Sequence, residues 1–375
     1  MTNKERLMRT LNGQPVDRPP VSFYELGGYH QDPHDTHEYN IYSHPSWHDL
    51  LTLARTRTDK IVINSPRFTE NEKDYPVIST QEVIGDSIHY ITEITTPRGV
   101  ITKRARRDKD IDTGWTLEHF LKNADDARAY LSLPEDEICD IDISQVLKCE
   151  EDIGTTGIAS IDIGDAICVC AELFSMEDYL VFALTERELF LKLLERAHRK
   201  ILKRVQMTAK ALPGRLYRIC GPEYASPPYL PPSLFREYVV PFDTELIGEI
   251  HKSGGFARVH SHGNLADIIG DIAAMGADGL DPIEPPPQGD VSLKFVREKY
   301  GEQLVLFGNI ELVEIETLPE DVFRERVKQA LSDGMYGQGR GFVLMPSASP
   351  ISRQLPTLAY RNYLTMVELA ERAWY

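Results

Sequence analysis

Long hydrophobic runs are missing from this 375-residue chain. No apolar segment is long enough to cross a bilayer, which takes roughly 18 residues or more, so no membrane span is expected. The opening segment, MTNKERLMRTLNG, is polar and amphipathic and lacks the apolar stretch of a secretion signal. The five cysteines are an odd number in a long chain, which is not typical of a disulfide scaffold. We therefore expect a cytoplasmic protein with reduced thiols.

Positive charge is also scarce, because 41 Lys and Arg face 58 Asp and Glu and leave a net charge of -17. Binding to nucleic acid requires clustered cations opposite the phosphates. The one dense basic run, KRARR at residues 103–107, is followed at once by acidic residues, and we interpret it as a solvated strand edge. No nucleic-acid partner is expected.

A regular alternation of patterns is present instead. Short apolar, β-branched or aromatic runs, each closed by Gly, Pro, Asn or Ser, predict eight strands. They cover residues 19–26, 60–64, 155–162, 215–220, 256–262, 278–284, 303–309 and 341–347. A first helical pattern begins near residue 46. Further helical patterns cover residues 186–212, 232–254, 264–276, 290–301, 319–334 and 351–373. Such alternation predicts a parallel sheet, and eight strands predict an α/β fold of the (β/α)8 TIM-barrel class, one domain over residues 1–375.

One region departs from the alternation. Residues 90–107, YITEITTPRGVITKRARR, predict a β-hairpin that turns at Pro97-Arg98-Gly99. We interpret residues 86–135 as an inserted hairpin and helix segment, which could serve as a lid or as an interface.

The candidate site lies where a barrel places its chemistry, at the carboxyl ends of the strands. His260 and His262 are two residues apart in a predicted strand, so both can face the barrel axis, with Glu223 at the end of the preceding strand. Two imidazoles, a carboxylate and an open fourth position form a usual catalytic zinc site. We predict that Glu223, His260 and His262 bind Zn²⁺. The alternative is that His262 caps a turn and His260 is a core histidine.

Other polar residues at the predicted mouth are assigned to catalysis or substrate binding. Glu25, Asn64 and Glu284 are predicted to orient the substrate, although Glu25 could equally cap its own loop. The predicted substrate-binding residues are Tyr24, Tyr29, Asn309 and Ser347. The tyrosines would suit an aromatic substrate by stacking and would equally suit a packed lid.

These motifs resemble the uroporphyrinogen decarboxylase superfamily along nearly the whole chain. RLMRTLNGQPVDRPPV resembles the family's first helix and strand, and TPRGVITKRAR resembles its hairpin. VHSHGNLADIIGDIAAMGADGLDPIE resembles the metal-bearing strand and helix, and YGEQLVLFGNIE a strand near the end. The resemblance implies the barrel fold independently of the pattern of strands.

The resemblance also implies which branch the chain joins. True decarboxylases carry an arginine-bearing loop near the N-terminus, where this chain has FYELGGYHQDPHD, and an aspartate where it has NSPRF. An acidic, arginine-poor mouth disfavours a substrate with many carboxylates. Cobalamin-dependent methyltransferases of the other branch bind zinc through a His-x-Cys pair and a later cysteine. Here His260-Ser261-His262 and MPSASP stand in those places.

Imidazole and carboxylate ligands leave more positive charge on a metal than thiolates do, which favours the polarisation of an oxygen atom. The resemblance thus implies an O-demethylase-type, zinc-dependent methyltransferase. It would move a methyl group from a methoxylated small molecule to a corrinoid (cobalamin) carried by a partner protein, because the chain lacks an Asp-x-His-x-x-Gly motif. The alternatives are a decarboxylase or lyase of a small carboxylic acid, a thiol methyltransferase, and a non-catalytic binding protein. A homodimer is left open.

Overall fold

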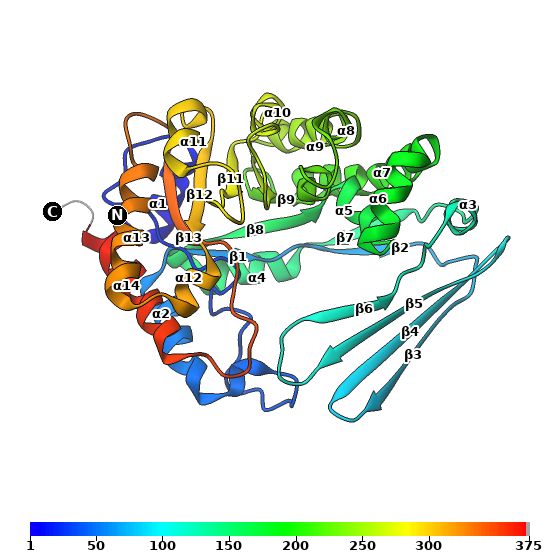
Figure 1. Ribbon diagram of the computed structural model, residues 1–375, viewed down its shortest axis with the longest axis horizontal. Coiled ribbons are helices and arrows are strands. Elements are labelled where there is room, and N and C mark those ends of the chain that lie inside the picture. The colour runs from blue at the N-terminus through cyan, green and yellow to red at the C-terminus, as the bar shows by residue number, and fades with distance from the viewer. Residues whose placement is uncertain (373–375) are drawn as a thin grey trace.

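Seven parallel strands form a curled sheet at the centre of the computed structural model, which describes residues 1–372 (Figure 1). Their spatial order follows the chain: β1 (Lys60–Ile63), β8 (Gly157–Gly164), β9 (Leu216–Cys220), β10 (Phe256–Ser261), β11 (Gly279–Pro282), β12 (Val305–Ile310) and β13 (Phe342–Pro346). Each coincides with a predicted strand to within three residues at either end. Most of the strand residues are buried, as in other parallel sheets whose faces are both covered.

The remaining predicted strand, residues 19–26, is reduced to a single bridge. Val21 pairs in parallel with Leu344 of β13, and its carbonyl oxygen accepts a hydrogen bond of 2.7 Å from the backbone N–H of Asp59, next to β1. The segment therefore joins the two edges of the curled sheet. A longer strand does not form partly because Pro19 and Pro20 have no N–H to donate. The predicted barrel class is confirmed, with seven regular strands and one bridge.

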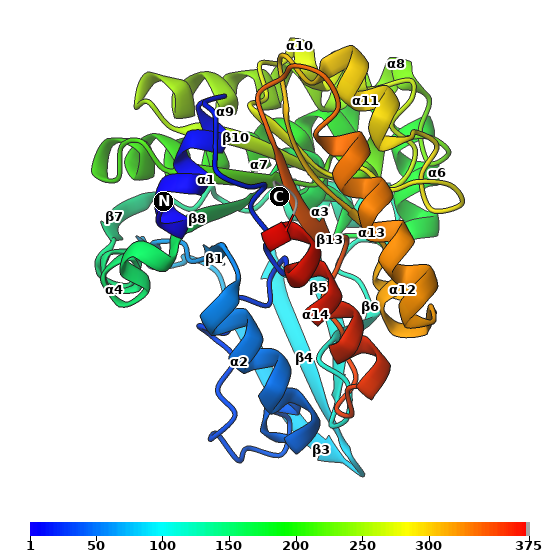
Figure 2. The ribbon, with the colours of Figure 1, turned by 90° about the vertical axis from the view of Figure 1, so that its left-hand side faces the viewer.

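Helices cover the outside of the curled sheet (Figure 2). They are α2 (His48–Arg57), α5 (Ala166–Ala171), α6 (Met176–Thr185), α7 (Arg187–Ala211), α8 (Pro232–Tyr238), α9 (Val240–Lys252), α10 (Ile269–Ala274), α11 (Leu293–Tyr300), α12 (Leu312–Thr317), α13 (Glu320–Gly334) and α14 (Thr357–Arg372). No helix within residues 1–372 has the length and hydropathy to cross a membrane.

Three predicted helices differ from the observed ones. The helix predicted at 232–254 divides at Val239, because Pro241 in the first turn of α9 cannot continue the hydrogen bonding of α8. The helix predicted from residue 264 begins only at Ile269. The last helix begins at Thr357, after Pro356, and residue 373 of its predicted range lies outside the described residues.

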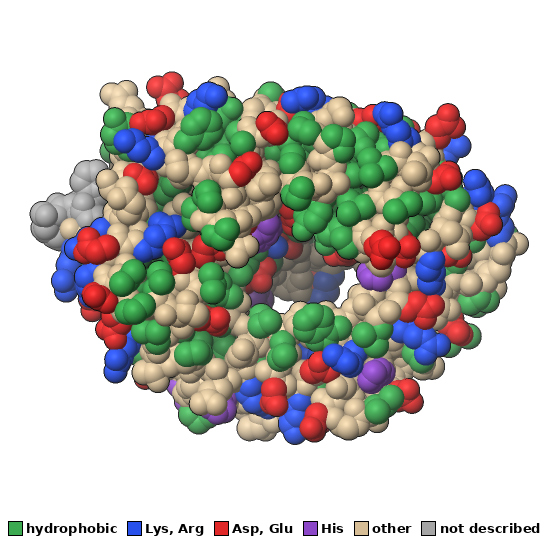
Figure 3. Space-filling model, viewed as in Figure 1, with side chains coloured by type: hydrophobic (Ala, Val, Ile, Leu, Met, Phe, Trp, Pro, Cys, Tyr) green, Lys and Arg blue, Asp and Glu red, His purple; other side chains and the backbone are tan. Residues whose placement is uncertain are grey.

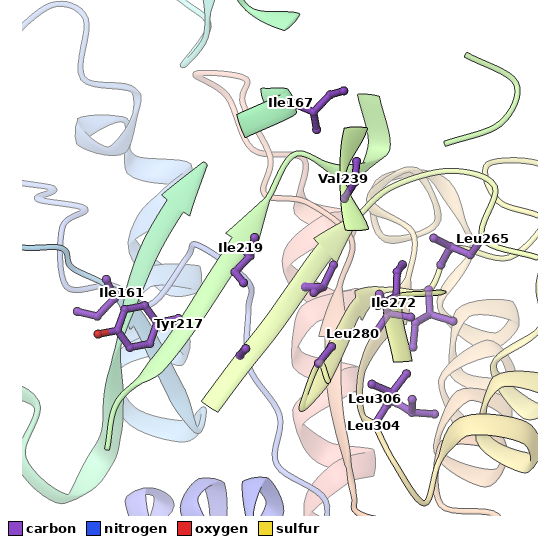
Figure 4. Packing of buried hydrophobic residues seen from close by; sticks show 14 of the residues in the cluster. Ile161, Ile167, Tyr217, Ile219, Val239, Leu265, Ile272, Leu280, Leu304 and Leu306 are labelled. Atoms are coloured by element: carbon purple, nitrogen blue, oxygen red, sulfur yellow. The ribbon is translucent and has the colours of Figure 1, made fainter. Parts of the chain in front are cut away.

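The wall of the sheet packs against these helices through aliphatic side chains. Tyr217 and Ile219 of β9 and Leu280 of β11 are fully buried on the outer face of the strands, and Leu280 lies near Ile272 of α10 (Figure 4). A second, smaller core fills the interior of the barrel, where Leu7 and Leu11 of α1 (Asn3–Leu11) pack with residues of β12 and β13. Helix α1 therefore closes the amino-terminal end of the barrel and leaves the carboxyl end for the site.

An antiparallel sheet projects away from the barrel in both views (Figures 1 and 2). Its order is β3 (Val77–Ile84), β4 (Ser87–Thr96), β5 (Gly99–Asp108) and β6 (Gly114–Glu118), and the predicted hairpin is the β4–β5 pair. The same connection between β1 and β8 holds β2 (Arg67–Glu70), paired with β7 (Ile138–Asp142), and the helices α3 (Ala124–Leu131) and α4 (Ser144–Ile153). The insertion is therefore broader than the predicted hairpin.

Candidate active site

The molecule is hollowed between the barrel and the antiparallel sheet, and histidine side chains lie at the rim of this hollow (Figure 3). A cavity of about 590 Å³ at the barrel mouth is lined by Tyr24, Glu25 and Tyr29 after the bridge strand, Asp162 of β8, and Ile351 after β13. Ligand pockets usually have volumes of roughly 300–1,000 Å³. The cavity therefore has room for a small organic molecule.

Two arginines occupy the interior of the barrel beneath the mouth. Arg218 of β9 and Arg258 of β10 are direct neighbours in register and are only 7% and 2% exposed. Arg218 forms ion pairs with Asp162 (Nε to Oδ1, 2.7 Å) and Glu25 (Nη1 to Oε1, 2.8 Å). Arg258 pairs with Asp281 of β11 (Nε to Oδ1, 3.2 Å). Buried charges require such partners, and here each guanidinium has one.

Among the described residues no arginine lines the mouth cavity, in agreement with the arginine-poor loop FYELGGYHQDPHD, but two arginines lie beneath it. Arg218 contacts the lining residues Glu25 and Asp162 from β9, and Arg258 lies beside it on β10. They could have been identified from the alternation of side chains, because Arg258 and His260 share one face of β10. The partners Glu25 and Asp162 bind Arg218, so Glu25 has a side-chain partner beyond its own loop.

His260 belongs to a chain of hydrogen bonds across the mouth. The register of β10 and β11 places Asp281 opposite His260, and their Oδ2 and Nδ1 atoms are 2.8 Å apart. The other ring nitrogen, Nε2, lies 3.3 Å from the hydroxyl of Tyr24, which also accepts a hydrogen bond from Arg218. Burial raises the pKa of Asp281, but the charges of Arg258 and His260 outweigh it and lower the pKa to about 2. Asp281 is therefore ionised at neutral pH.

His262 is held in the same way by a second carboxylate. Its Nδ1 lies 2.8 Å from Oε1 of Glu284, whose other oxygen accepts the backbone N–H of Gly263 at 2.9 Å. Burial opposes protonation of His262, yet the hydrogen bond and charge of Glu284 raise its pKa. The two imidazole rings lie 4.6 Å apart between centroids and nearly perpendicular to each other.

The two histidines fit part of a metal site. Both histidines use Nδ1 for a carboxylate, which fixes the tautomer that presents Nε2, the usual arrangement for histidines that bind a metal. Glu223, on the short 3-10 turn η4 (Pro222–Ala225), accepts the backbone N–H of Gly221, and its charge contributes to the raised pKa of His262. Across residues 1–372 no three His, Cys, Asp or Glu side chains are already grouped as metal ligands. The structure thus brings together two of the three predicted ligands.

Backbone strain coincides with the site. Tyr24 and Ile283 have positive φ angles of 54° and 55°, and no other non-glycine residue of the described chain does. Each precedes a carboxylate of the mouth, Glu25 and Glu284 respectively. Such strain costs on the order of 1–3 kcal/mol per residue and concentrates at functional sites. The strain supports a functional constraint at this end of the barrel.

Two predicted residues lie toward helix α4 and away from the histidines. The Tyr29 hydroxyl donates to Asp152 at 2.9 Å, and Asn64 hydrogen-bonds through its backbone to Ser160 at 2.9 Å. The side-chain oxygen of Asn64 is buried without a hydrogen-bond partner within the described chain. Tyr29 still lines the mouth cavity, whereas Asn64 does not.

Two further predicted residues support neighbouring helices. Asn309 accepts a hydrogen bond from Arg326 of α13. Ser347 accepts the backbone N–H of Leu312 at 3.2 Å and lies 3.4 Å from Oε2 of Glu311. The sequence patterns missed Glu311, which directly follows β12 in FGNIE. Burial, followed by the charge of Glu284, raises the pKa of Glu311 to about 7, so this side chain can both donate and accept a proton near neutral pH.

A family model and one solved structure agree with this architecture. A family model described as "Uroporphyrinogen decarboxylase (URO-D)" matches residues 167–372. The solved structure of a methyltransferase from Methanosarcina mazei is similar over 100% of both chains, with 18% identity and a TM-score of 0.61. The structure of D-psicose 3-epimerase with D-tagatose from Clostridium cellulolyticum H10 covers 61% of this chain and 83% of its own, with 9% identity and a TM-score of 0.38. No curated protein matches the chain.

Proposed function

The chain belongs to the uroporphyrinogen decarboxylase family, whose model matches more than half of it, and from that premise we propose that it is a methyltransferase. It would take a methyl group from a methoxylated or similarly methylated small molecule and pass it to a corrinoid carried by a partner protein. One solved structure that it resembles over its whole length is a methyltransferase, which supports the reaction class.

One observation carries the proposal, namely the pair of histidines that are each anchored at Nδ1 by a buried carboxylate. Asp281 is fully buried and Glu284 is 8% exposed, so neither is a surface partner acquired by chance. Burying two carboxylates beside two imidazoles costs desolvation energy that a merely structural turn does not need. The arrangement leaves Nε2 of His262 for another ligand, and Nε2 of His260 for a ligand that displaces the Tyr24 hydroxyl.

We propose that this ligand is Zn²⁺, held by His260, His262 and Glu223. For that, the Tyr24 hydroxyl would leave Nε2 of His260, and the Glu223 carboxylate would leave the backbone of Gly221. When bound, zinc would supply positive charge beside the oxygen that loses the methyl group. Nitrogen and oxygen ligands suit that role better than thiolates, because they neutralise less of the charge on the metal.

The chain's own residues would then divide the remaining tasks. Asp281 and Glu284 hold the imidazoles, which moves Glu284 from the predicted substrate-orienting role to a positioning role. Glu25 is half exposed at the cavity and can contact the substrate while it accepts from Arg218. Tyr24 and Tyr29 line the cavity, and their rings would suit an aromatic methyl ether. A role in substrate binding stays a prediction for Asn64, Asn309 and Ser347.

The corrinoid would be carried by a second protein. The sequence lacks the Asp-x-His-x-x-Gly motif for cobalamin, and the mouth cavity of about 590 Å³ has room for a small methyl donor. The partner would therefore approach the open mouth next to the antiparallel sheet and present its cofactor to the bound donor from outside.

A decarboxylase or lyase of a small carboxylic acid is the second candidate, and Arg218 and Arg258 favour it because an arginine can bind a carboxylate. Both guanidiniums already pair with carboxylates of the chain, so neither is free for a substrate anion. A thiol methyltransferase is the third candidate. A measurement of methyl transfer and of CO2 release distinguishes the proposed methyltransferase from a decarboxylase.

The test uses the full-length protein under anaerobic, reducing conditions with cob(I)alamin and a panel of methoxylated aromatic compounds. The proposal expects a donor-dependent change of the spectrum from cob(I)alamin to methylcobalamin. The variant His260→Ala/His262→Ala should lose the reaction, whereas His198→Ala/His251→Ala, which removes two histidines outside the mouth, should retain it. Release of CO2 from a carboxylic acid without methyl transfer would contradict the proposal.

A further inference from the structure

The outer edge of the antiparallel sheet is open along its whole length. Strand β3 pairs with β4 at all eight of its residues and has no strand on its other side among residues 1–372. Every residue of β3 is exposed, and Figure 1 shows it as the outermost strand, farthest from the barrel. Proteins usually protect such edges with lysine, proline or a bulge. The segment VISTQEVI contains none of these, and its register with β4 is regular.

The backbone of β3 has hydrogen-bonding groups to offer at this edge. Ile84 and Ser87 close a two-residue turn at Gly85-Asp86, so they bond to each other, and the pattern alternates from there. The N–H and C=O groups of the odd-numbered residues therefore point away from β4. These residues are Val77, Ser79, Gln81 and Val83. They form an acceptor and donor ladder that a further antiparallel strand can complete.

We propose that β3 of a second copy of this chain completes the ladder, antiparallel and centred on Thr80. A two-fold axis perpendicular to the sheet relates the copies and keeps each face of the sheet continuous. Opposite residues must then lie on the same face, and pairing Thr80 with itself meets that condition. The two four-stranded sheets would become one sheet across the dimer.

Like side chains of β3 face each other in this register at every pair except Ile78 with Glu82. Val77 lies opposite Val83 of the second copy, and these side chains are 39% and 67% exposed in the single chain. Ser79 lies opposite Gln81, which makes a polar pair. By symmetry, each of these two pairs occurs twice in the dimer. The only charged residue of the strand, Glu82, lies opposite Ile78 of the second copy and not opposite its own copy. Pairs of apolar residues across strands stabilise a sheet, whereas like charges would destabilise it.

The charge of the whole molecule restricts where two copies can touch. Each chain has a net charge of -17, so two chains repel each other over most of their surface. Strand β3 has one charge in eight residues and four exposed apolar side chains: Val77, Ile78, Val83 and Ile84. The edge faces away from the barrel, so the dimer leaves both mouths accessible. The inference does not depend on the proposed chemistry.

The experiment measures the mass of the full-length protein by light scattering and sedimentation at tens of micromolar concentration. The wild type should have twice the chain mass of 42.6 kDa. The variant Val77→Lys/Val83→Lys places like charges opposite each other and should be a monomer. The variant Val77→Glu/Val83→Lys places opposite charges there and should be a dimer again. The two positions lie too far apart within one chain to rescue each other.

The control is Val100→Lys/Leu117→Lys, which adds the same charge to the same sheet on β5 and β6. These side chains are 58% and 53% exposed, which is similar to the 67% exposure of Val83. Neither of them lies on β3. This variant should stay dimeric, and circular dichroism should show that all variants are folded. A monomeric wild type would overturn the inference, even if another protein binds to the edge. So would a dimer in the double-lysine variant or a monomer in the Glu–Lys variant.

Discussion

The interior of the barrel and the antiparallel sheet use side chains in opposite ways. In the barrel, the charged Arg258 is 2% exposed, whereas on the sheet the apolar Val83 is 67% exposed. Neither placement is what hydrophobicity alone would give. The two buried arginines near the mouth are each paired with a carboxylate, whereas the apolar side chains of β3 are exposed in the single chain.

The difference teaches how to recognise two kinds of functional surface. A cluster of buried and fully paired charges costs desolvation energy, which a protein tolerates where chemistry requires fixed groups. Exposed apolar side chains on a regular edge are tolerated where another chain covers them. The mouth therefore indicates a reaction site and the sheet an association site.

The largest effect should come from a buried arginine. Arg258→Met leaves Asp281 with one partner fewer in a fully buried position, and the free energy of unfolding should fall by about 3–5 kcal/mol. The same change in the sheet, Arg104→Met, removes an exposed pair with Glu118 and should cost about 0–1 kcal/mol. Urea unfolding of both variants measures the contrast. Equal losses would show that the two regions do not differ.

The next effect concerns pH and a pair of acids in the barrel wall. Asp165, which caps α5, and Asp243 of α9 are both fully buried, and burial raises the pKa of Asp243 to about 8. The folded state keeps a proton that the unfolded state releases near pH 4. The stabilisation that this bound proton gives to the folded state is thus complete below about pH 4. It is lost as the pH rises to about 8, by up to about 1.4 kcal/mol per pH unit.

Asp243→Asn removes this proton linkage. The difference in unfolding free energy between the variant and the wild type should therefore shift in favour of the variant from pH 5 to pH 8. Chemical denaturation at both pH values measures it. A difference that stays constant would show that the pair does not hold an extra proton.

A smaller effect tests the carboxylates that position the histidines. Glu284→Gln should weaken zinc binding by about 10- to 100-fold, because residues that orient a metal ligand contribute on that scale. The matched change Glu245→Gln alters another carboxylate that contacts a histidine, His198, away from the mouth. It should leave zinc affinity unchanged. Competition with a chelator gives both affinities, and equal weakening would remove the special role of Glu284.

The smallest effect compares one substitution in both regions. Val100→Thr on the exposed sheet should change stability by less than about 0.5 kcal/mol, since it removes little burial. Val259→Thr in the fully buried wall of β10 should cost about 1–3 kcal/mol, because it places a hydroxyl without a partner among apolar atoms. Thermal unfolding distinguishes them. A large loss at Val100 would place that side chain in a contact within the folded chain.

The sequence patterns predicted the positions of the strands well and the hydrogen bonds between distant segments poorly. The runs that became β8 to β13 were identifiable because buried parallel strands are continuously apolar. The helix near Asn264 was overestimated, since Asp290 fixes the backbone of Leu265 and Ala266 in a turn. Local periodicity contains no information on such long-range bonds.

The candidate site shows the same limit. His260 and His262 were chosen from their spacing at the end of a predicted barrel strand, and the two imidazole rings do lie together. That Asp281 holds His260 depends on the register between β10 and β11, which no single segment specifies. Glu223 was placed by its position after a strand, but its turn directs the carboxylate to the backbone of Gly221.

The central claim is that the histidines of the barrel mouth bind a metal ion. Elemental analysis of the purified wild type and of His260→Ala/His262→Ala tests it most directly. The account predicts about one zinc per chain in the wild type and none in the variant. Zinc that stays bound in the variant, or a wild type that binds none when zinc is supplied, would contradict it.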